Sequence, residues 1–135
     1  MAQTLCQLKK KGGGKMAETI LWTNSAPTSA QSTQDVTLSQ GIDNFKYIKF
    51  IVRNSKSNAN SIEVIYPIAN VQSSAQTVNH MLITFGGVPD TTSYNHIRRV
   101  YYKSNTVLNI GNTNTVGGSG SFNDFIIITQ IIGLK

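Results

Sequence analysis

The chain has 135 residues, of which 39% are apolar and 13% are charged, and its 12 Lys and Arg outnumber its 6 Asp and Glu. A chain of this length forms one domain, and this apolar fraction is enough for one compact core. No apolar run approaches the roughly 20 residues that a bilayer span needs, which argues against insertion into a membrane. Ser, Thr, Asn and Gln account for 48 residues, so amides and hydroxyls form most of the polar surface.

The N-terminal segment holds much of the positive charge. Lys9, Lys10, Lys11 and Lys15 lie in a stretch with three consecutive glycines and no acid. We therefore expect residues 1–18 to form a flexible basic arm, which either attaches the protein to a partner or keeps it in solution. Four charges without interleaved aromatic rings do not favour sequence-specific binding of nucleic acid. The arm also lacks the apolar stretch of a secretory signal.

Alternation of apolar and polar residues predicts strands through the rest of the chain, 19–135. Two short candidates cover 18–24 and 34–39. Residues 45–54 place Ile48, Phe50 and Val52 on one face, as a period of two requires.

Residues 62–68 form the next predicted strand, which joins the preceding one in a hairpin with a polar loop. Pro67 donates no backbone hydrogen bond, so this strand lies at a sheet edge or ends there. Further strands are predicted at 81–85 and over 96–110, where one long strand or two strands joined near Ser104 fit equally. Since no segment has a helical period, the sequence predicts an all-β antiparallel sandwich, jelly-roll-like, or a related barrel.

The final segment is apolar on both faces, unlike the other predicted strands. Such a run is either central in its sheet with both faces covered, or it places one face against a neighbouring subunit. The outer face of a two-layer sandwich is normally wet, so we expect a homo-oligomer interface here. The residues assigned to it are Phe125, Ile126, Ile127, Ile128, Ile131 and Ile132.

A cluster of aromatic and basic residues forms a candidate ligand surface. Its members are Tyr94, His96, Arg98, Arg99, Tyr101 and Tyr102. Exposed tyrosine rings in all-β domains stack on sugars or anchor protein contacts. The alternative is that the tyrosines pack at the sheet margin and the arginines lie along its polar surface. Trp22 is expected in the core or an interface.

The sequence contains no motif that points to catalysis or to a cofactor. His80, His96 and the single Cys6 match no metal-ligand spacing, and Cys6 can close no intrachain disulfide. The acids are scattered one per segment, at Glu18, Asp35, Asp43, Glu63, Asp90 and Asp124. Two of them could meet as a glycosidase pair, but we do not expect an enzyme, a metal or a cofactor.

Several segments resemble a known family. The order ILWTN, QDVTLSQ, FKYIKFIVRN and SIEVIYPI, with the close FNDFIIITQIIGLK, looks like the small β-sandwich domains of bacteriophage tail and fibre proteins. The resemblance covers about residues 19–135. It implies a virion protein, made in the bacterial cytoplasm, that self-assembles, often as a trimer, binds other virion proteins and contacts a glycan of the host surface. It carries no catalytic residue.

The chain departs from a typical fibre because no repetitive shaft or heptad region is present. This departure leaves a capsid-decoration or head-fibre role as one alternative, with the N-terminal arm held by the virion. A free carbohydrate-binding module is the other alternative, and it would present a row of exposed aromatic rings.

Overall fold

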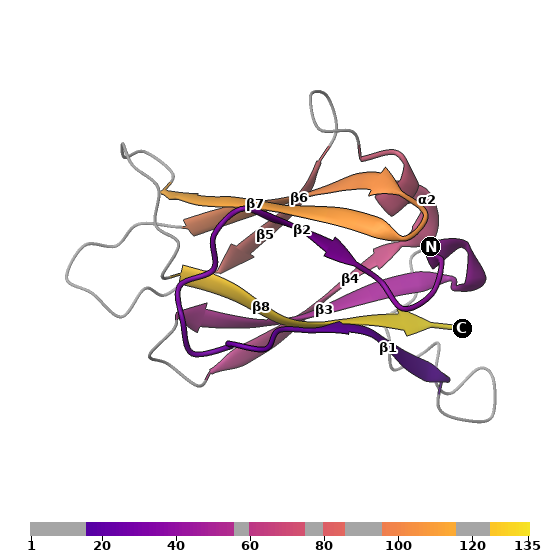
Figure 1. Ribbon diagram of the computed structural model, residues 1–135, viewed down its shortest axis with the longest axis horizontal. Coiled ribbons are helices and arrows are strands. Elements are labelled where there is room, and N and C mark those ends of the chain that lie inside the picture. The colour runs from indigo at the N-terminus through magenta and orange to yellow at the C-terminus, as the bar shows by residue number, and fades with distance from the viewer. Residues whose placement is uncertain (1–15, 56–59, 75–79, 86–95, 116–124) are drawn as a thin grey trace, which may run out of the picture.

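A computed structural model describes residues 16–55, 60–74, 80–85, 96–115 and 125–135, leaving out the side chains of Phe85 and Thr115. The protein is a sandwich of two antiparallel four-stranded sheets (Figure 1). This architecture confirms the all-β sandwich predicted from the alternating sequence. No helix within these ranges has the length and hydropathy needed to cross a membrane.

The two sheets are built from strands that lie far apart in the sequence. The first sheet has the order β1 (Glu18–Thr23), β8 (Phe125–Leu134), β3 (Tyr47–Ser55) and β4 (Ser61–Pro67). The second sheet has the order β2 (Gln34–Thr37), β7 (Val107–Thr115), β6 (His96–Ser104) and β5 (Met81–Phe85). A 3-10 turn η1 (Ile42–Asn44) and a short helix α2 (Ile68–Gln72) connect strands.

The strand pairing follows two patterns. The ends of the chain pair in a nested way, β1 with β8 and β2 with β7. The middle strands pair with their sequence neighbours, β3 with β4 and β6 with both β5 and β7, and β3 also pairs with β8. Pairing of the first strands with the last ones is a feature of jelly rolls, but hairpins between consecutive strands also occur in other sandwiches. The more specific jelly-roll topology therefore stays a prediction.

The predicted strand positions agree with the structure. Strands β3 and β4 form the expected hairpin, and β4 ends at Pro67 on the edge of its sheet, where a missing N–H does no harm. The segment 96–110 holds two strands, because the chain turns at Asn105 and Thr106. β1 begins at Glu18, so the sandwich includes the last residue assigned to the arm.

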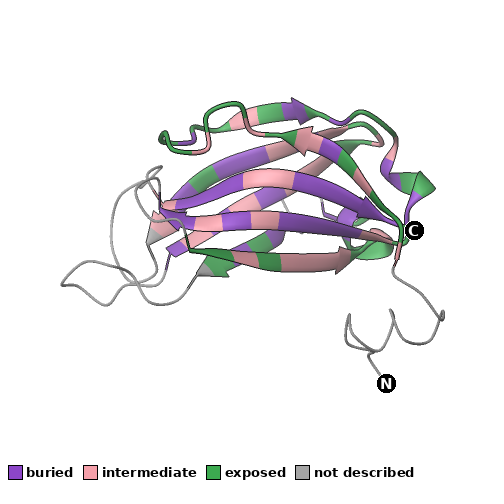
Figure 2. Cartoon of the chain, turned by 90° about the horizontal axis from the view of Figure 1, so that it is seen from below, coloured by how far each residue is buried: buried purple, intermediate pink, exposed green. Residues whose placement is uncertain are grey.

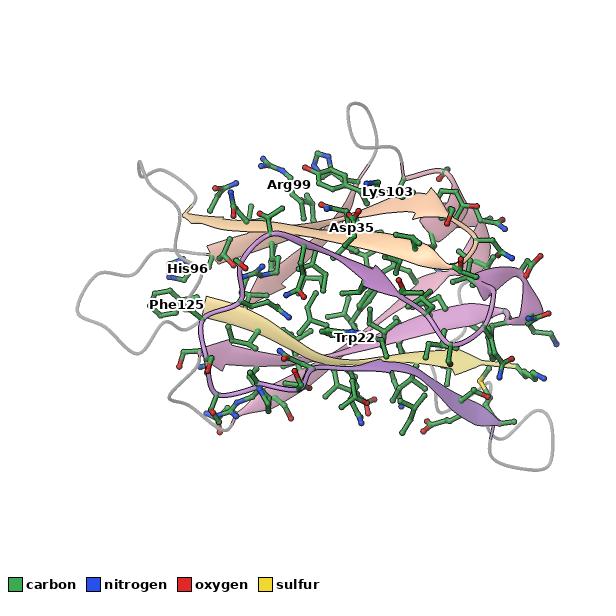
Figure 3. All side chains as sticks on the ribbon, in the orientation of Figure 1. Trp22, Asp35, His96, Arg99, Lys103 and Phe125 are labelled. Carbon is green, nitrogen blue, oxygen red and sulfur yellow. The ribbon has the colours of Figure 1, made fainter. Side chains whose placement is uncertain are left out.

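The core lies between the sheets. Ile48, Phe50 and Val52 of β3 belong to one buried cluster with residues of the second sheet such as Val100 and Leu108. Trp22 packs against this cluster and lies between the layers (Figure 3), which agrees with its expected place in the core.

The predicted oligomer interface on β8 is wrong, because its own chain covers both faces of the strand. Ile126, Ile127, Ile128 and Ile131 are 0% exposed and Ile132 is 6% exposed in the single chain. Phe125 packs partly buried against the core. Figure 2 shows β8 buried along most of its length between β1 and β3. Neighbouring copies are therefore not needed to cover these side chains.

Two cationic side chains of β3 explain how the outer face of β8 is covered. Lys49 is paired with Ile132 on β8, and its Nζ donates to Glu18 Oε1 on β1 at 2.7 Å. Arg53 is paired with Ile127, and its guanidinium donates to the carbonyl of Pro27 at 3.4 Å, beyond the end of β1. Both side chains therefore cross β8, so that their aliphatic parts lie over isoleucines while their charges find partners on the far side.

Candidate functional site

Strand β6 divides its side chains between the core and the outer face of the second sheet, as the sequence alternation predicts. His96, Arg98 and Val100 are buried, whereas Arg99 and Lys103 are at least partly exposed. In Figure 3, Arg99 and Lys103 lie on the side of the second sheet that faces away from the first. Of the predicted ligand-surface residues on β6, only those whose side chains point to the outer face can therefore contact a ligand.

Arg98 and His96 do not belong to the ligand surface, which corrects the prediction. The Arg98 side chain is 0% exposed and donates to the carbonyls of Gly111 at 2.6 Å and Gln31 at 2.9 Å. Burial lowers the pKa of Arg98 to about 10. The His96 ring stacks on Phe125 with 4.2 Å between centroids (Figure 3).

The other predicted residues fall into three groups. Tyr101 stands on the outer face with Arg99. Tyr102 packs against the core, and its N–H donates to the Ser74 carbonyl at 2.9 Å. Tyr94 and the arm lysines Lys9, Lys10, Lys11 and Lys15 lie outside the described residues.

A bulge in β7 shapes the outer face beside Arg99. The pairing runs from Arg98 with Thr113 to Val100 with Ile110, so Gly111 and Asn112 together oppose the single residue Arg99. An extra residue of this kind bends the strand and redirects its side chains, often beside functional sites. The buried Arg98 holds the bulge from inside through the Gly111 carbonyl.

The bulge creates a polar hollow, here called the Arg99 depression. Its volume is ≈ 220 Å³, and it is lined by Thr33, Arg99, Tyr101, Asn109, Gly111, Asn112 and Asn114. Gly111 lies close to β6, since a Cβ there would lie 3.2 Å from the Arg99 carbonyl oxygen and 3.4 Å from Tyr101 Cε2. On its other side the Tyr101 ring makes an edge contact with His80, at 5.7 Å between centroids. The ring is thus held beside the hollow.

Hydrogen bonds fix two of the three asparagine side chains that line the depression. The Thr33 hydroxyl donates to Asn112 Oδ1 at 2.6 Å, and Asn109 Nδ2 donates to Asp35 Oδ1 at 2.7 Å. Lys103 Nζ lies 2.8 Å from Asp35 Oδ2. The hydrogen bonds from Lys103 and Asn109 lower the pKa of Asp35 below its ordinary 3.8. The carboxylate beside the depression is therefore ionised and already neutralised by a lysine.

Gln31 was not singled out from the sequence, although it supports the same region. Its side-chain amide accepts from the Ile128 N–H at 2.9 Å and donates to the Ile128 carbonyl at 3.0 Å. It thereby replaces a partner strand where β1 has ended, while its own carbonyl accepts from Arg98. A buried glutamine in a Ser- and Thr-rich connector gives no sequence signal that separates it from exposed neighbours.

A second hollow, of ≈ 370 Å³, lies beside Tyr66, Ser73, Ser74 and His80. Its three hydroxyl groups are already occupied, whereas the side chains of Asn70 and His80, which also line it, form no hydrogen bond within the described residues. The Tyr66 hydroxyl donates to the Leu82 carbonyl at 2.6 Å, and the Ser73 and Ser74 hydroxyls donate to the carbonyls of Asn70 and Val71. The Arg99 depression is the better candidate because it also contains a guanidinium that has no partner among the described residues.

The carboxylates of the described ranges serve as local partners of other side chains. Glu18 and Glu63 both contact Lys49, at 2.7 and 3.4 Å, and Asp43 accepts from Asn105 at 2.9 Å. Asp90 and Asp124 lie outside these ranges. Among the residues that are described, no three His, Cys, Asp or Glu gather as metal ligands do.

No family model matches the chain, and a comparison with curated proteins finds no match.

Proposed function

We propose that this protein is a structural component of a bacteriophage virion, of the tail or fibre class, whose second sheet contacts a glycan on the host surface. The likeness of residues 19–135 to small tail and fibre domains supports the virion role. The antiparallel sandwich is consistent with the fold that this likeness implies.

The Arg99 depression is the observation that carries the glycan assignment. An aromatic ring offers its face to the apolar side of a sugar, and amides bind neighbouring hydroxyls as both donors and acceptors. Tyr101 supplies such a ring, and Asn109, Asn112 and Asn114 supply amides around it. The central part of the hollow lies on paired strands β6 and β7, so its geometry is fixed before a ligand binds.

The binding test uses the purified chain on an array of bacterial surface polysaccharides. We expect selective binding that is lost in Tyr101→Ala and weakened in Asn114→Ala. Thr37→Ala is the matched control, because Thr37 is exposed on β2 of the same sheet but does not line the depression. Equal binding by Tyr101→Ala and the control, or the absence of binding to every polysaccharide, would contradict the glycan role.

The virion assignment has a separate test. Mass spectrometry of purified phage particles should find the chain, and antibody labelling in electron micrographs should place it on the tail. Labelling of the head would favour the capsid-decoration or head-fibre alternative. If the protein is absent from the particles but still binds a glycan, the result would favour a free carbohydrate-binding module.

Self-assembly remains part of the proposal, through the exposed edge of the first sheet rather than through the buried isoleucines of β8. Ile20 is 55% exposed on β1, an edge strand of the first sheet. It shares one row of the outer face with Ile132, Lys49 and Ile65. This row offers apolar surface around a central ion pair, which suits contact with another copy.

A further inference from the structure

We propose that the Arg99 depression recognises an oxyanion, a carboxylate or a phosphate ester carried by a polyhydroxylated polymer, rather than a neutral sugar alone. This inference rests on the proposed glycan contact and names the chemical class of its ligand. It follows from which donors and acceptors of the depression are still unused.

Arg99 provides an unpaired cation at the depression. It forms no ion pair or hydrogen bond in the described parts of the chain, and its Nε is buried without an acceptor there. A guanidinium presents several donors in a fixed fork and binds carboxylate or phosphate through two of them. An arginine whose donors lack partners is therefore suited to an incoming anion.

The side chain of Asn112 provides a further hydrogen-bond donor beside Arg99. Asn112 Oδ1 is occupied by the Thr33 hydroxyl at 2.6 Å, which leaves the Asn112 NH₂ group to face a ligand. The bulge brings this amide opposite Arg99. Asn114, across from Ile97, adds an amide that forms no hydrogen bond within the described ranges.

The carboxylate that could repel an anion is already neutralised. Asp35 is held by Lys103 at 2.8 Å and by Asn109 at 2.7 Å, so its charge is paired outside the hollow. Asp35 does not line the depression, whereas Asn109, which binds it, does. The field at the centre of the depression is thus that of the Arg99 cation.

The test compares four probes of known charge by isothermal titration with the full-length chain. They are a hexuronic acid oligomer, a neutral hexose oligomer of equal length, a glycerol phosphate polymer and inorganic phosphate. We expect one of the two anionic polymers to bind at least about tenfold more tightly than the neutral oligomer, as one charge-assisted contact allows. Which polymer binds identifies carboxylate or phosphate as the group, and inorganic phosphate should compete with the phosphate polymer only.

Variants separate the specific cation from net charge. Arg99→Gln should reduce binding of the anionic polymer about tenfold or more and leave any weak binding of the neutral oligomer unchanged. Lys46→Gln removes one charge at an exposed position just before β3, outside the depression, and this variant should bind as the wild type does. Near-UV circular dichroism of both variants checks that they are folded.

Three other results overturn the inference in different ways. Equal binding of neutral and anionic oligomers, unaffected by Arg99→Gln, would refute the oxyanion and keep the glycan contact. No binding of any probe, combined with an empty polysaccharide array, would refute both. Equal losses in Arg99→Gln and Lys46→Gln would show that overall charge, and not the depression, attracts the polymer.

Discussion

Arg98 is a buried cation that helps to shape the outer face of the second sheet, although its own side chain lies in the core. Its guanidinium holds the bulge at Gly111 from inside, and the next residue, Arg99, faces the depression. A second donor fixes Gln31, whose amide completes the pairing of β8. One buried side chain therefore links the segment after β1 to the bulge on the outer face of the second sheet.

We predict that Arg98→Met destabilises the protein. The lowered pKa of Arg98, about 10 against 12.5, means that burying its charge opposes folding by about 3 kcal/mol. Its removal leaves the carbonyls of Gly111 and Gln31 without these donors, at about 1–3 kcal/mol each, and adds an imperfectly filled space. We expect the lost hydrogen bonds and the unfilled space to outweigh the relief from burying a charge. Urea denaturation should therefore show that the free energy of unfolding falls by about 2 kcal/mol. An unchanged or higher midpoint would contradict this account.

Asp35 allows a direct check of the charges around the depression. Because Lys103 and Asn109 donate to its carboxylate, the pKa of Asp35 should lie below 3.8 in an NMR titration. Lys103→Met should raise this pKa toward its ordinary value, whereas Lys46→Met should leave it unchanged. Since Asp35 is exposed, neither variant should change the denaturation midpoint strongly. A normal Asp35 pKa in the wild type would contradict the pairing.

At the scale of the element, β8 shows that an apolar strand need not mark an interface. Lys49 and Arg53 cross it from β3 and reach partners on its other side. The first sheet thereby turns its outer face into a partly covered layer within a single chain.

We predict that Lys49 stabilises the first sheet in a pH-dependent way. Burial alone lowers the pKa of Lys49, but hydrogen bonding to Glu18 and the charges of Glu63 and Glu18 outweigh burial, and the pKa is raised above 10.5. A cation with a raised pKa contributes its full stabilisation below its unfolded pKa, and this is lost as the pH rises through the folded pKa. Lys49→Met should therefore lower the free energy of unfolding by about 1 kcal/mol at neutral pH.

The difference in urea midpoint between wild type and Lys49→Met should narrow as the pH rises through the folded-state pKa of Lys49, which lies above 10.5. Lys46→Met, which removes an exposed lysine, should show no such trend. A difference that stays constant through pH 12, or grows, would contradict the ion-pair role of Lys49.

The strands could be predicted because alternation is a local property of the chain. Ile48, Phe50 and Val52 mark the inner face of β3, and the Arg99–Tyr101 alternation on β6 was equally readable. The coverage of β8 could not be predicted, because it depends on Lys49 reaching across a strand that follows it by more than 75 residues.

The amides of the depression were missed for a similar reason. Asn109, Asn112 and Asn114 lie on β7, and their spacing departs from a period of two at one point. Gly111 lies within that irregular step, and an isolated glycine inside a strand is a signal for a bulge. That signal was available in the sequence. The position of the bulge opposite Arg99 could not be predicted from the sequence, because it depends on the register between β6 and β7.

At the scale of the whole molecule, the two outer faces differ in character. The face of the second sheet carries Arg99, Tyr101 and several amides, whereas the face of the first sheet carries isoleucines around Lys49. The proposed virion role requires one surface for other copies and another for the host, and we propose the first and second sheets for these two contacts.

We predict that self-association depends on Ile20. Wild type should elute as an oligomer in size-exclusion chromatography with light scattering, with a trimer favoured by the fibre likeness. Ile20→Lys should shift it to monomer, because a charge in an apolar contact opposes association. Leu82→Lys is the matched control, since Leu82 is 41% exposed on the opposite sheet. A wild type that stays monomeric at high concentration would remove self-assembly from the proposal.

Amide chemical-shift mapping tests the central proposal, a ligand-binding face on the second sheet, most directly. Titration of an acidic oligosaccharide that binds should shift the backbone resonances of Arg99, Tyr101, Gly111 and Asn112 together, while those of Lys49 and Ile132 on the first sheet stay in place. Shifts that concentrate on the first sheet, or that leave the bulge in β7 unmoved at saturation, would contradict the account.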